Sequence, residues 1–448
     1  MTVGCWNTSE GRSKSAAYSR SYFSQVIASM KTTRRTFLQL GGTAAGAAAF
    51  NIVPVCVLGN RAPGNRIAMG MIGLGGMGFA NMESFLALGD VTVRAVCDAN
   101  AQKMQAAKTR VDAHYGNRDC KMFGDFRALC ACSDIDAVMI ATPNHGHALI
   151  GIEAARCGKD IYGERPFSHT LQDGRALVDA VMNAERVWQT GNRQRSQVGF
   201  SRAAAWVRNG GLGRLERVEV GMPGGGRGPD VSPVSGSLPE GLDWKAWLGT
   251  APQRAYCGVC DFHWRWVSEW GGGMLMDGIG LYGDIALWGA GRDATGPVRV
   301  EGSGLYVVDG PYDTATSFSF RCLYDDGLEL AIADGGRMEK GVGVRWIGRD
   351  GEWVWVTHGA LEASRPEILQ AVIGSEADKL FAVEGNASNQ TASLRHYRNF
   401  IDCVKSRRTT VAPAEAAHRA ATLGHLGQIA MRGGRVIRFD PRTETLLV

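Results

Sequence analysis

Gly73-Leu74-Gly75-Gly76-Met77-Gly78 decides the fold, because this stretch stands between an apolar run and a helical pattern. Residues 67–72 predict a buried strand, and residues 79–88 place apolar side chains at helical spacing. Gly73 permits a tight turn, Gly75 lets the backbone approach a pyrophosphate, and Gly78 lets helix and strand pack closely. Strand, turn and helix together predict a dinucleotide site with the pyrophosphate at the helix N-terminus.

An acid at a fixed distance strengthens this prediction, since glycine spacing alone is weak support in a chain with 60 glycines. A second predicted strand, Val91–Cys97, ends at Asp98, which lies 20 residues after Gly78. A carboxylate there accepts hydrogen bonds from ribose hydroxyls and repels a 2'-phosphate, and Ala99 adds no positive charge. NAD is therefore favoured over NADP. Capping of the following helix is an alternative role for Asp98 and is compatible with the first.

The first half of the chain alternates between predicted strands and helices. Strands are predicted at Ile67–Ile72, Val91–Cys97, Ala137–Ile140 and Asp160–Tyr162, and helices at Phe79–Leu88, Ala101–Tyr115 and His147–Arg156. This alternation predicts an α/β Rossmann domain with a doubly wound parallel sheet. Ligand should lie at the carboxyl edge of that sheet, where residues 142–147 and 163–166 emerge.

Beyond Gly191 the pattern changes to successive strands joined by short turns. Strands are predicted at Leu215–Gly221, Arg299–Val308, Ala315–Tyr324, Leu328–Ala333, Gly343–Gly348 and Glu352–Thr357, and helices near Ser393–Ser406 and Pro413–Arg432. The pattern predicts an α+β domain with a largely antiparallel open sheet. We expect an N-terminal extension with an export signal at 1–65, an NAD-binding Rossmann domain at 66–190, and a C-terminal substrate and oligomerisation domain at 191–448 whose helices return to the Rossmann domain.

The export signal is a twin-arginine pattern. Thr33-Arg34-Arg35-Thr36-Phe37-Leu38-Gln39 precedes a modest apolar stretch that reaches Val57, and Met30 is an alternative start. This looks like a Tat signal. We therefore expect a periplasmic or otherwise extracytoplasmic protein, with the Tat translocase as its partner during export.

Composition argues against some classes of partner. The net charge of +5 is partly due to the leader, and no basic run interleaved with aromatic residues indicates nucleic-acid binding. Most of the 11 cysteines are expected to be core thiols. Cys257 and Cys260 have zinc-like spacing and His263 follows, but no fourth ligand is evident, so no metal is expected.

Several motifs occurring together resemble the glucose-fructose oxidoreductase and inositol dehydrogenase (Gfo/Idh/MocA) superfamily over nearly the whole mature length. They are Ile72–Gly78, Asp98, Thr142-Pro143-Asn144 with His147, Gly163-Glu164-Arg165-Pro166, Gly191–Ser196 and Gly271–Asp277; the runs Leu242–Gly249, Phe262–Trp266 and His418–Leu426 resemble a Tat-exported branch. The resemblance implies a Rossmann domain that holds NAD(P) and a sheet domain that binds sugars, cyclitols or related polyols, in a homo-oligomer formed through that sheet.

The resemblance also implies residue roles at the cofactor. Gly73, Leu74, Gly75, Met77, Gly78 and Asp98 would bind the dinucleotide, together with Thr142, Asn144, His147, Glu164, Arg165 and Asn192. Asn144 and His147 would lie beside the ribose and nicotinamide end. The alternative makes Asn144 part of a turn and His147 a helix-start residue.

Two departures from the superfamily pattern bear on catalysis. The usual Glu-Lys-Pro has Arg165 in its middle, and the usual histidine of Asp-x-Gly-x-His is replaced by Leu281. Arginine orients a sugar oxygen but is a poor proton shuttle, and leucine accepts no proton. Tyr282 or His263 is then the candidate general base, with Asp277 orienting either one. The alternatives are that Tyr282 only packs on its helix and that His263 is structural.

Localisation constrains the reaction, because the periplasm is not expected to hold a free NAD pool. The favoured hypothesis is an oxidoreductase for a sugar, cyclitol or related polyol whose tightly bound cofactor is recycled internally. Two alternatives stay open: an NAD-dependent redox-cycling glycosidase or lyase, which needs no carboxylate pair, and a catalytically impaired homologue that binds carbohydrate.

Overall fold

The computed structural model of the 448-residue chain describes residues 66–226, 237–256, 258, 263–307, 310, 312–374 and 389–447. The twin-arginine motif, Cys257 and Cys260 lie outside these ranges. Within them, no helix is both long and apolar enough to span a membrane. The same residues contain no cluster of three or more His, Cys, Asp or Glu side chains able to hold a metal ion.

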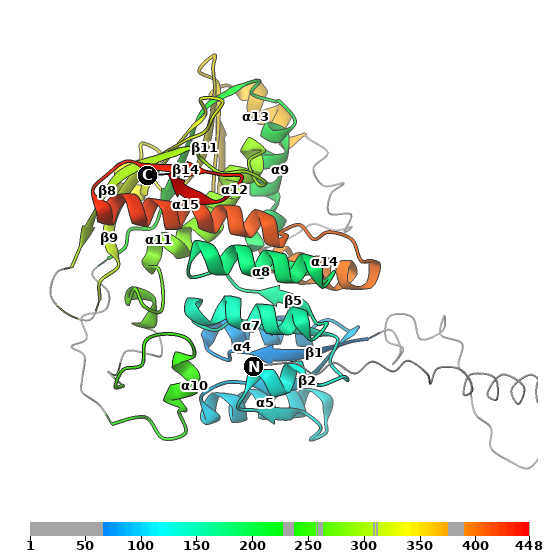
Figure 1. Cartoon of the computed structure of the whole chain (residues 1–448). Helices are drawn as coiled ribbons and strands as arrows, with labels where there is room; N and C mark the ends of the chain where they lie inside the picture. The colour runs from blue at the N-terminus through cyan, green and yellow to red at the C-terminus, as the bar shows by residue number, and fades with distance from the viewer. Residues whose placement is uncertain are drawn as a thin grey trace, which may run out of the picture. The chain divides into compact units, whose positions relative to one another are not determined.

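A six-stranded parallel sheet forms the first part of the described chain (Figure 1). Its strands are β1 (Ile67–Ile72), β2 (Val91–Cys97), β3 (Lys121–Phe123), β4 (Ala137–Ile140), β5 (Asp160–Gly163) and β6 (Trp188–Thr190), in the order β3-β2-β1-β4-β5-β6. All four residues of β4 and all four of β5 are buried. Continuous burial of this kind is expected when helices cover both faces of a parallel sheet.

The connecting helices follow the strands in alternation. They are α4 (Gly76–Leu86), α5 (Ala101–Tyr115), α6 (Phe126–Cys130), α7 (Asn144–Arg156) and α8 (Leu171–Asn183). Local sequence fixes their ends: the Asn100 side chain accepts hydrogen bonds from the first turn of α5, and Gly116 ends that helix in a left-handed conformation. This sheet with its helices is the predicted Rossmann architecture.

A second sheet of nine strands follows within the described residues. It contains β7 (Leu215–Met222), β8 (Arg299–Tyr306), β9 (Ala315–Leu323), β10 (Glu329–Asp334), β11 (Gly343–Gly348), β12 (Trp353–Thr357), β13 (Ala360–Ala363), β14 (Ile437–Asp440) and β15 (Thr445–Leu447). The order is β13-β12-β11-β7-β10-β9-β8-β14-β15, and the β7–β10 pair is parallel while the others are antiparallel. The predicted fold class is confirmed, with one parallel pair inside the largely antiparallel sheet.

The remaining helices follow β6 in the chain. They are η4 (Arg193–Ser196), α9 (Val198–Arg208), α10 (Trp244–Leu248), η5 (His263–Trp266), α11 (Gly273–Gly278), the π-helix η6 (Ile279–Gly283), α12 (Asp284–Ala290), η7 (Gly335–Arg337), α13 (Pro366–Ile373), α14 (Asn389–Ser406) and α15 (Ala414–Gly433). Helices α9, α12 and α15 pack on the sheet, and α15 also contacts α8 of the Rossmann domain (Figure 1). Trp346 of β11, fully buried, donates from its indole to the carbonyl of Ala286 in α12 at 3.1 Å.

Helix α14 returns to the Rossmann domain through charged contacts. Asp90 is 2 % exposed and accepts from Arg398 at 2.6 Å and from Lys405 at 2.5 Å. Arg407 donates to Asp160 at 2.6 Å. Burial raises the pKa of Asp90, yet the bonds from Arg398 and Lys405 outweigh burial and bring it below the ordinary value. These ion pairs fix α14 beside the nucleotide-binding half.

A second ionic network joins α8, α15 and the C-terminal strands. Glu444 contacts Arg175 at 2.5 Å, His418 at 2.8 Å and Arg419 at 3.0 Å. Arg175 also pairs with Glu415 at 2.8 Å. Burial raises the pKa of Glu444, but the hydrogen bonds from His418 and Arg175 dominate and lower it to about 2. The carboxylate is therefore held in its charged form.

Candidate functional site

The glycine turn has the geometry that a dinucleotide requires. Gly73 has φ +83°, and a β-carbon there would come within 2.8 Å of the backbone of Ala141 and Thr142. A β-carbon on Gly78 would collide with the carbonyl oxygen of Gly73. Gly75 is the N-cap of α4, no side chain caps the helix, and the space around its β-position is open. The N-terminus of α4 thus presents backbone N–H groups and the positive end of the helix dipole.

Asp98 ties the glycine turn to the next strand. Its Oδ2 accepts from the Leu74 N–H at 2.6 Å and its Oδ1 accepts from the Asn100 N–H at 2.8 Å. The Asn100 side chain accepts from Gln102 and Lys103 in the first turn of α5. The alternative prediction that Asp98 caps this helix is therefore wrong, because Asn100 does so.

A cavity of about 700 Å³ adjoins the turn. Of the predicted cofactor residues, Gly73, Gly75, Asp98 and Thr142 line it; Leu74, Met77, Gly78, Asn144, His147, Glu164, Arg165 and Asn192 are not among its lining residues. The Thr142 hydroxyl is buried and has no hydrogen-bond partner among the described residues. Concave shape, an uncapped helix N-terminus and an unsatisfied hydroxyl fit a dinucleotide, so the residues present are suited to this cofactor.

His147 and Asn144 are buried on α7. The two ring nitrogens of His147 lie 2.9 Å from the Pro166 carbonyl and 2.8 Å from the Thr142 carbonyl. Burial lowers the pKa of His147, which favours the neutral ring. This geometry makes His147 a brace between the two loops at the carboxyl edge of the sheet. Contact of His147 or Asn144 with the cofactor stays a prediction.

Glu164 lies at the centre of a buried polar cluster at the end of β5. It accepts from Asn81 at 3.0 Å and from Arg165 at 2.7 Å, and Tyr397 of α14 donates to Asn81 at 2.7 Å. Burial raises the pKa of Glu164, but Arg165 and the nearby Arg193 bring it below its ordinary value. The charged carboxylate therefore holds the Arg165 guanidinium in place.

The motif that has Leu281 in place of the usual histidine lies beside the polar cluster around Glu164. A β-carbon on Gly280 would be 3.0 Å from the Arg165 β-carbon, so η6 runs directly past Arg165. Asn192 donates to the Leu281 carbonyl at 3.4 Å and also bonds to Asp284. The structure thus brings Arg165, Asn192 and the Leu281 turn together, although they lie far apart in sequence.

Asp284 anchors this helix from its far end. Arg195 donates to both of its carboxylate oxygens, at 2.5 and 2.7 Å, and both side chains are at most 5 % exposed. Paired, hydrogen-bonded charges of this kind hold an element in one position. The π-helix, an irregular element often associated with functional sites, is therefore fixed on both sides.

Tyr282 is buried and packs against two other rings. Its ring is 6.3 Å from the Phe200 ring and 6.2 Å from the His358 ring, and Gln194 lies 3.1 Å from His358. Burial raises the pKa of Tyr282. A phenol with a raised pKa is protonated at neutral pH and donates a hydrogen bond more readily than it accepts a proton.

Asp277 has a different partner from those predicted. Arg265 of η5 forms an ion pair with it and lies over the Trp264 ring, with its central carbon 4.7 Å from the ring centroid. His263, in the same short helix, has its ring near Trp266 and Tyr312, at 6.3 and 6.4 Å. Asp277 therefore positions Arg265, and its role in orienting His263 or Tyr282 stays a prediction.

One part of the cavity lining was not predicted from the sequence. Residues 241–250, which we call the Trp-rich strap, contain α10 and supply several of the residues that line the cavity. His145 of α7 lies between this strap and the η5 region, with its ring nitrogens 3.0 Å from the Trp247 carbonyl and 3.3 Å from the Trp270 carbonyl. The tryptophan run was visible in the sequence, but its spatial partner was not.

Comparison with known proteins agrees with this geometry. Residues 67–192 match the family model GFO_IDH_MocA, described as an oxidoreductase family with an NAD-binding Rossmann fold. The nucleotide-binding part of the chain therefore matches the family that its motifs resemble.

Individual relatives match about a quarter of the chain or less. A glycosyl hydrolase family 109 protein of Shewanella sp. (strain W3-18-1) is 31% identical over 123 residues, which are 27% of this chain and 27% of the relative. A levoglucosan dehydrogenase of Pseudarthrobacter phenanthrenivorans is 36% identical over 91 residues, 20% of this chain and 23% of the relative. The chain therefore spans only about a quarter of the length of these relatives.

A solved structure extends the likeness of fold to most of the chain. The WlbA dehydrogenase of Bordetella pertussis, in complex with NADH and UDP-GlcNAcA, has a TM-score of 0.61 at 17% identity, covering 84% of this chain and 98% of that protein. Both sheets are thus shared with a dehydrogenase of this fold.

Proposed function

We propose that the protein is an NAD-dependent oxidoreductase for a sugar, cyclitol or related polyol. The observation that carries the proposal is the juxtaposition of two sites: the uncapped glycine turn with Asp98, and the Glu164–Arg165 pair beside the η6 helix. The first suits a dinucleotide and the second presents an oriented cation to a small polar substrate. The relative that is named a levoglucosan dehydrogenase supports a carbohydrate substrate.

Arg165 would bind and orient a substrate oxygen rather than move a proton. Its guanidinium is held by Glu164 and is 18% exposed, and arginine is a poor proton shuttle. A bound NAD would supply hydride transfer, and the chain must supply a base for the hydroxyl proton. We propose His263 as the general base, because the buried Tyr282 phenol is protonated at neutral pH.

The cofactor we favour is NAD rather than NADP. The Asp98 carboxylate lines the cavity and would repel a 2'-phosphate. Lys103 and Lys245 line the same cavity, and their positive charges act against the repulsion of a 2'-phosphate by Asp98. Calorimetric titration with NADH and NADPH tests the choice, and tighter binding of NADPH would contradict it.

We further propose that the protein is exported by the Tat translocase with its cofactor already bound. The twin arginines support export, and the absence of a free periplasmic NAD pool then requires a cycle that regenerates the cofactor. Oxidation of one carbohydrate coupled to reduction of another would satisfy that requirement. Association of chains through the nine-stranded sheet remains our proposal for the assembly, to be tested by light scattering.

A second candidate is a redox-cycling glycosidase or lyase. The support is the relative named a glycosyl hydrolase of family 109, which is 31% identical over 123 residues of this chain. Such an enzyme oxidises a sugar hydroxyl transiently, eliminates a substituent and then reduces the product, with no net redox change.

One experiment separates these candidates. The purified protein is mixed with a panel of free sugars, polyols and glycosides while the absorbance of bound cofactor near 340 nm and the products are followed. We expect oxidation of one carbohydrate together with reduction of another, with the bound cofactor returned to its starting state. Glycoside cleavage without net redox change would favour the second candidate, and sugar binding with no turnover would indicate the catalytically impaired homologue.

A further inference from the structure

The Trp-rich strap is fastened to the Rossmann domain at the mouth of the cofactor cavity. Asn100 and Leu242 form an antiparallel bridge. The Ala101 N–H donates to the Gly241 carbonyl at 2.8 Å, and the Asp243 N–H donates to the Ala99 carbonyl at 2.9 Å. The strap thus adds a short backbone pairing directly after Asp98, at the ribose end of the expected cofactor.

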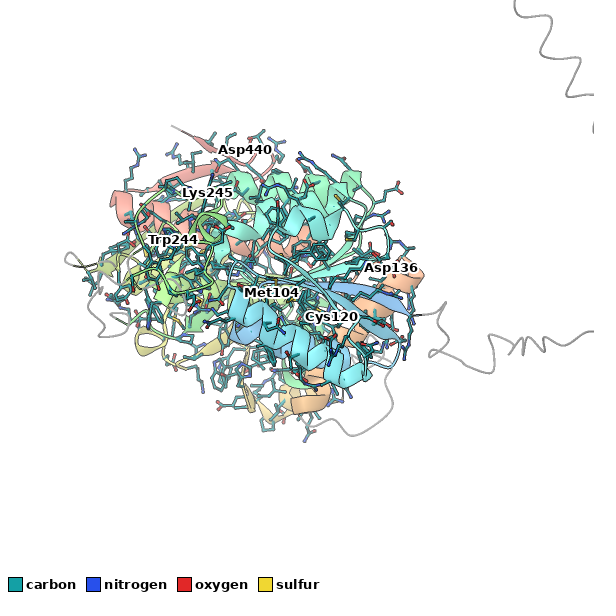
Figure 2. The ribbon with its side chains drawn as sticks, turned by 90° about the horizontal axis from the view of Figure 1, so that it is seen from below. Met104, Cys120, Asp136, Trp244, Lys245 and Asp440 are labelled. Atoms are coloured by element: carbon teal, nitrogen blue, oxygen red, sulfur yellow. The ribbon has the colours of Figure 1, made fainter. Side chains whose placement is uncertain are left out.

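The other end of the strap is fixed by aromatic packing. Trp244 and Trp247 of α10 stack with ring centroids 4.8 Å apart, and Trp247 meets the buried Trp270 edge-on at 4.9 Å. The Asp243 side chain caps α10 by accepting from Ala246 at 2.9 Å. Figure 2 shows Trp244 and Lys245 on α10, with Met104 on α5.

The cavity lies between the strap and the glycine turn. Gly73, Gly75 and Asp98 line one side, and Leu242 and Trp247 line the other. A dinucleotide with its pyrophosphate at the N-terminus of α4 would therefore be covered by the strap. Leaving the site would require the strap pairing to break or the ligand to slide along its length.

We propose that residues 241–250 form a clasp that makes the bound dinucleotide slow to exchange. This inference rests on the proposed function, since it takes the dinucleotide as the occupant of the cavity. The proposal gives the tryptophan run a role in retaining the cofactor, in addition to forming part of its binding site. A slow release rate is the property that an internally recycled cofactor needs.

A substitution at the first residue of α5 should open the clasp and leave that helix intact. Ala101 is the first residue of α5 and is exposed, and the preceding Asn100 has φ −105° and ψ 112°. Proline is tolerated at the first helical position and after an extended residue. In Ala101→Pro, a ring carbon replaces the hydrogen that Gly241 accepts, so one bond is lost and the strap is pushed outward. Ala101→Ser keeps the N–H and is the matched control.

The experiment measures release of NADH by the full chain, without any sugar. Protein loaded with NADH is mixed with excess NAD⁺, and loss of bound-NADH fluorescence gives the dissociation rate. We expect Ala101→Pro to accelerate release about 10- to 100-fold, with Ala101→Ser unchanged. Leu242→Ala, which trims the cavity wall and alters no backbone bond, should accelerate release in the same direction.

The outcomes distinguish this inference from the proposed function. Thermal unfolding identifies the variants that remain folded, and folded Ala101→Pro and Leu242→Ala proteins that release NADH at the wild-type rate would overturn the clasp alone. A wild-type chain that never binds NADH would overturn the proposed function and the clasp with it. Absence of sugar turnover leaves the release measurement intact.

Discussion

Replacement of Gly75 by valine should separate cofactor binding from folding. Gly75 lines the cavity, has an extended backbone with φ −65° and ψ −175°, and has nothing within 4 Å of its β-position. A valine therefore fits the protein without strain but takes up space next to the N–H groups of α4. The same exchange at most glycines of a packed fold would damage both properties.

The magnitudes follow from the lost contacts. A hydrogen bond to a charged group contributes about 1.5 to 3 kcal/mol, so keeping the pyrophosphate from one N–H group should weaken NADH binding about 10- to 160-fold. Stability should change by less than about 1 kcal/mol, because the weaker N-cap is offset by the smaller entropy of the unfolded chain.

Calorimetric titration with NADH and thermal unfolding of the empty protein measure the two quantities. Gly336→Val is the matched control, since Gly336 lies outside the cavity and its nearest neighbour, an Asp334 oxygen, is 3.6 Å away. Gly78→Ala is the contrasting variant: its methyl collides with the Gly73 carbonyl, so folding should suffer as well. Wild-type NADH affinity in the Gly75 variant would refute the placement of the pyrophosphate.

Three further predictions concern export, catalysis and pH. Replacing Arg34 and Arg35 together by lysine should leave the precursor in the cytoplasm, and unchanged periplasmic yield after cell fractionation would remove the Tat assignment. His263→Ala should lower turnover about 100- to 10,000-fold without loss of bound NAD, whereas Tyr282→Phe should have a smaller effect; the reverse order in steady-state kinetics would make the phenol the proton acceptor. Because the folded pKa of Glu444 is about 2, below the ordinary 4.5, its contribution to stability is present above pH 4.5 and is lost as pH falls towards 2. Glu444→Gln should therefore cost about 2 kcal/mol at pH 7, allowing for solvent screening, and the loss should shrink below pH 4.5; a pH-independent difference in urea unfolding would contradict the assignment.

Local sequence patterns predicted the strands and helices that can be recognised from neighbouring residues alone. The bounds of β1, β2 and β4 and of helix α5 agree with the prediction. Neighbouring residues are enough to identify a buried strand, or an amphipathic helix that begins after an Asn cap and ends at a Gly. The glycine turn and its distance to Asp98 belong to the same class. These features led to the Rossmann fold, which is confirmed, and to the family whose model residues 67–192 match.

Short strands escaped prediction, since pairing rather than pattern defines them. β3 and β6 have three residues each and exist through their partners β2 and β5. The parallel β7–β10 pair likewise joins segments separated by about a hundred residues. Alternation of side chains along a strand shows which face is buried but does not show which strand lies beside it.

The site shows the same division between local and distant information. The sequence by itself determined the nucleotide-binding turn, the acid after β2 and the absence of the usual lysine and histidine, because these are matters of residue identity at fixed spacing. Only the tertiary structure decided that Asp277 pairs with Arg265, that His147 braces two loops, and that residues of the segment 241–250 line the cavity. Charge pairing and cavity closure depend on distances between residues remote in the chain, and the burial that strengthens those contacts exists only once both sheets have formed.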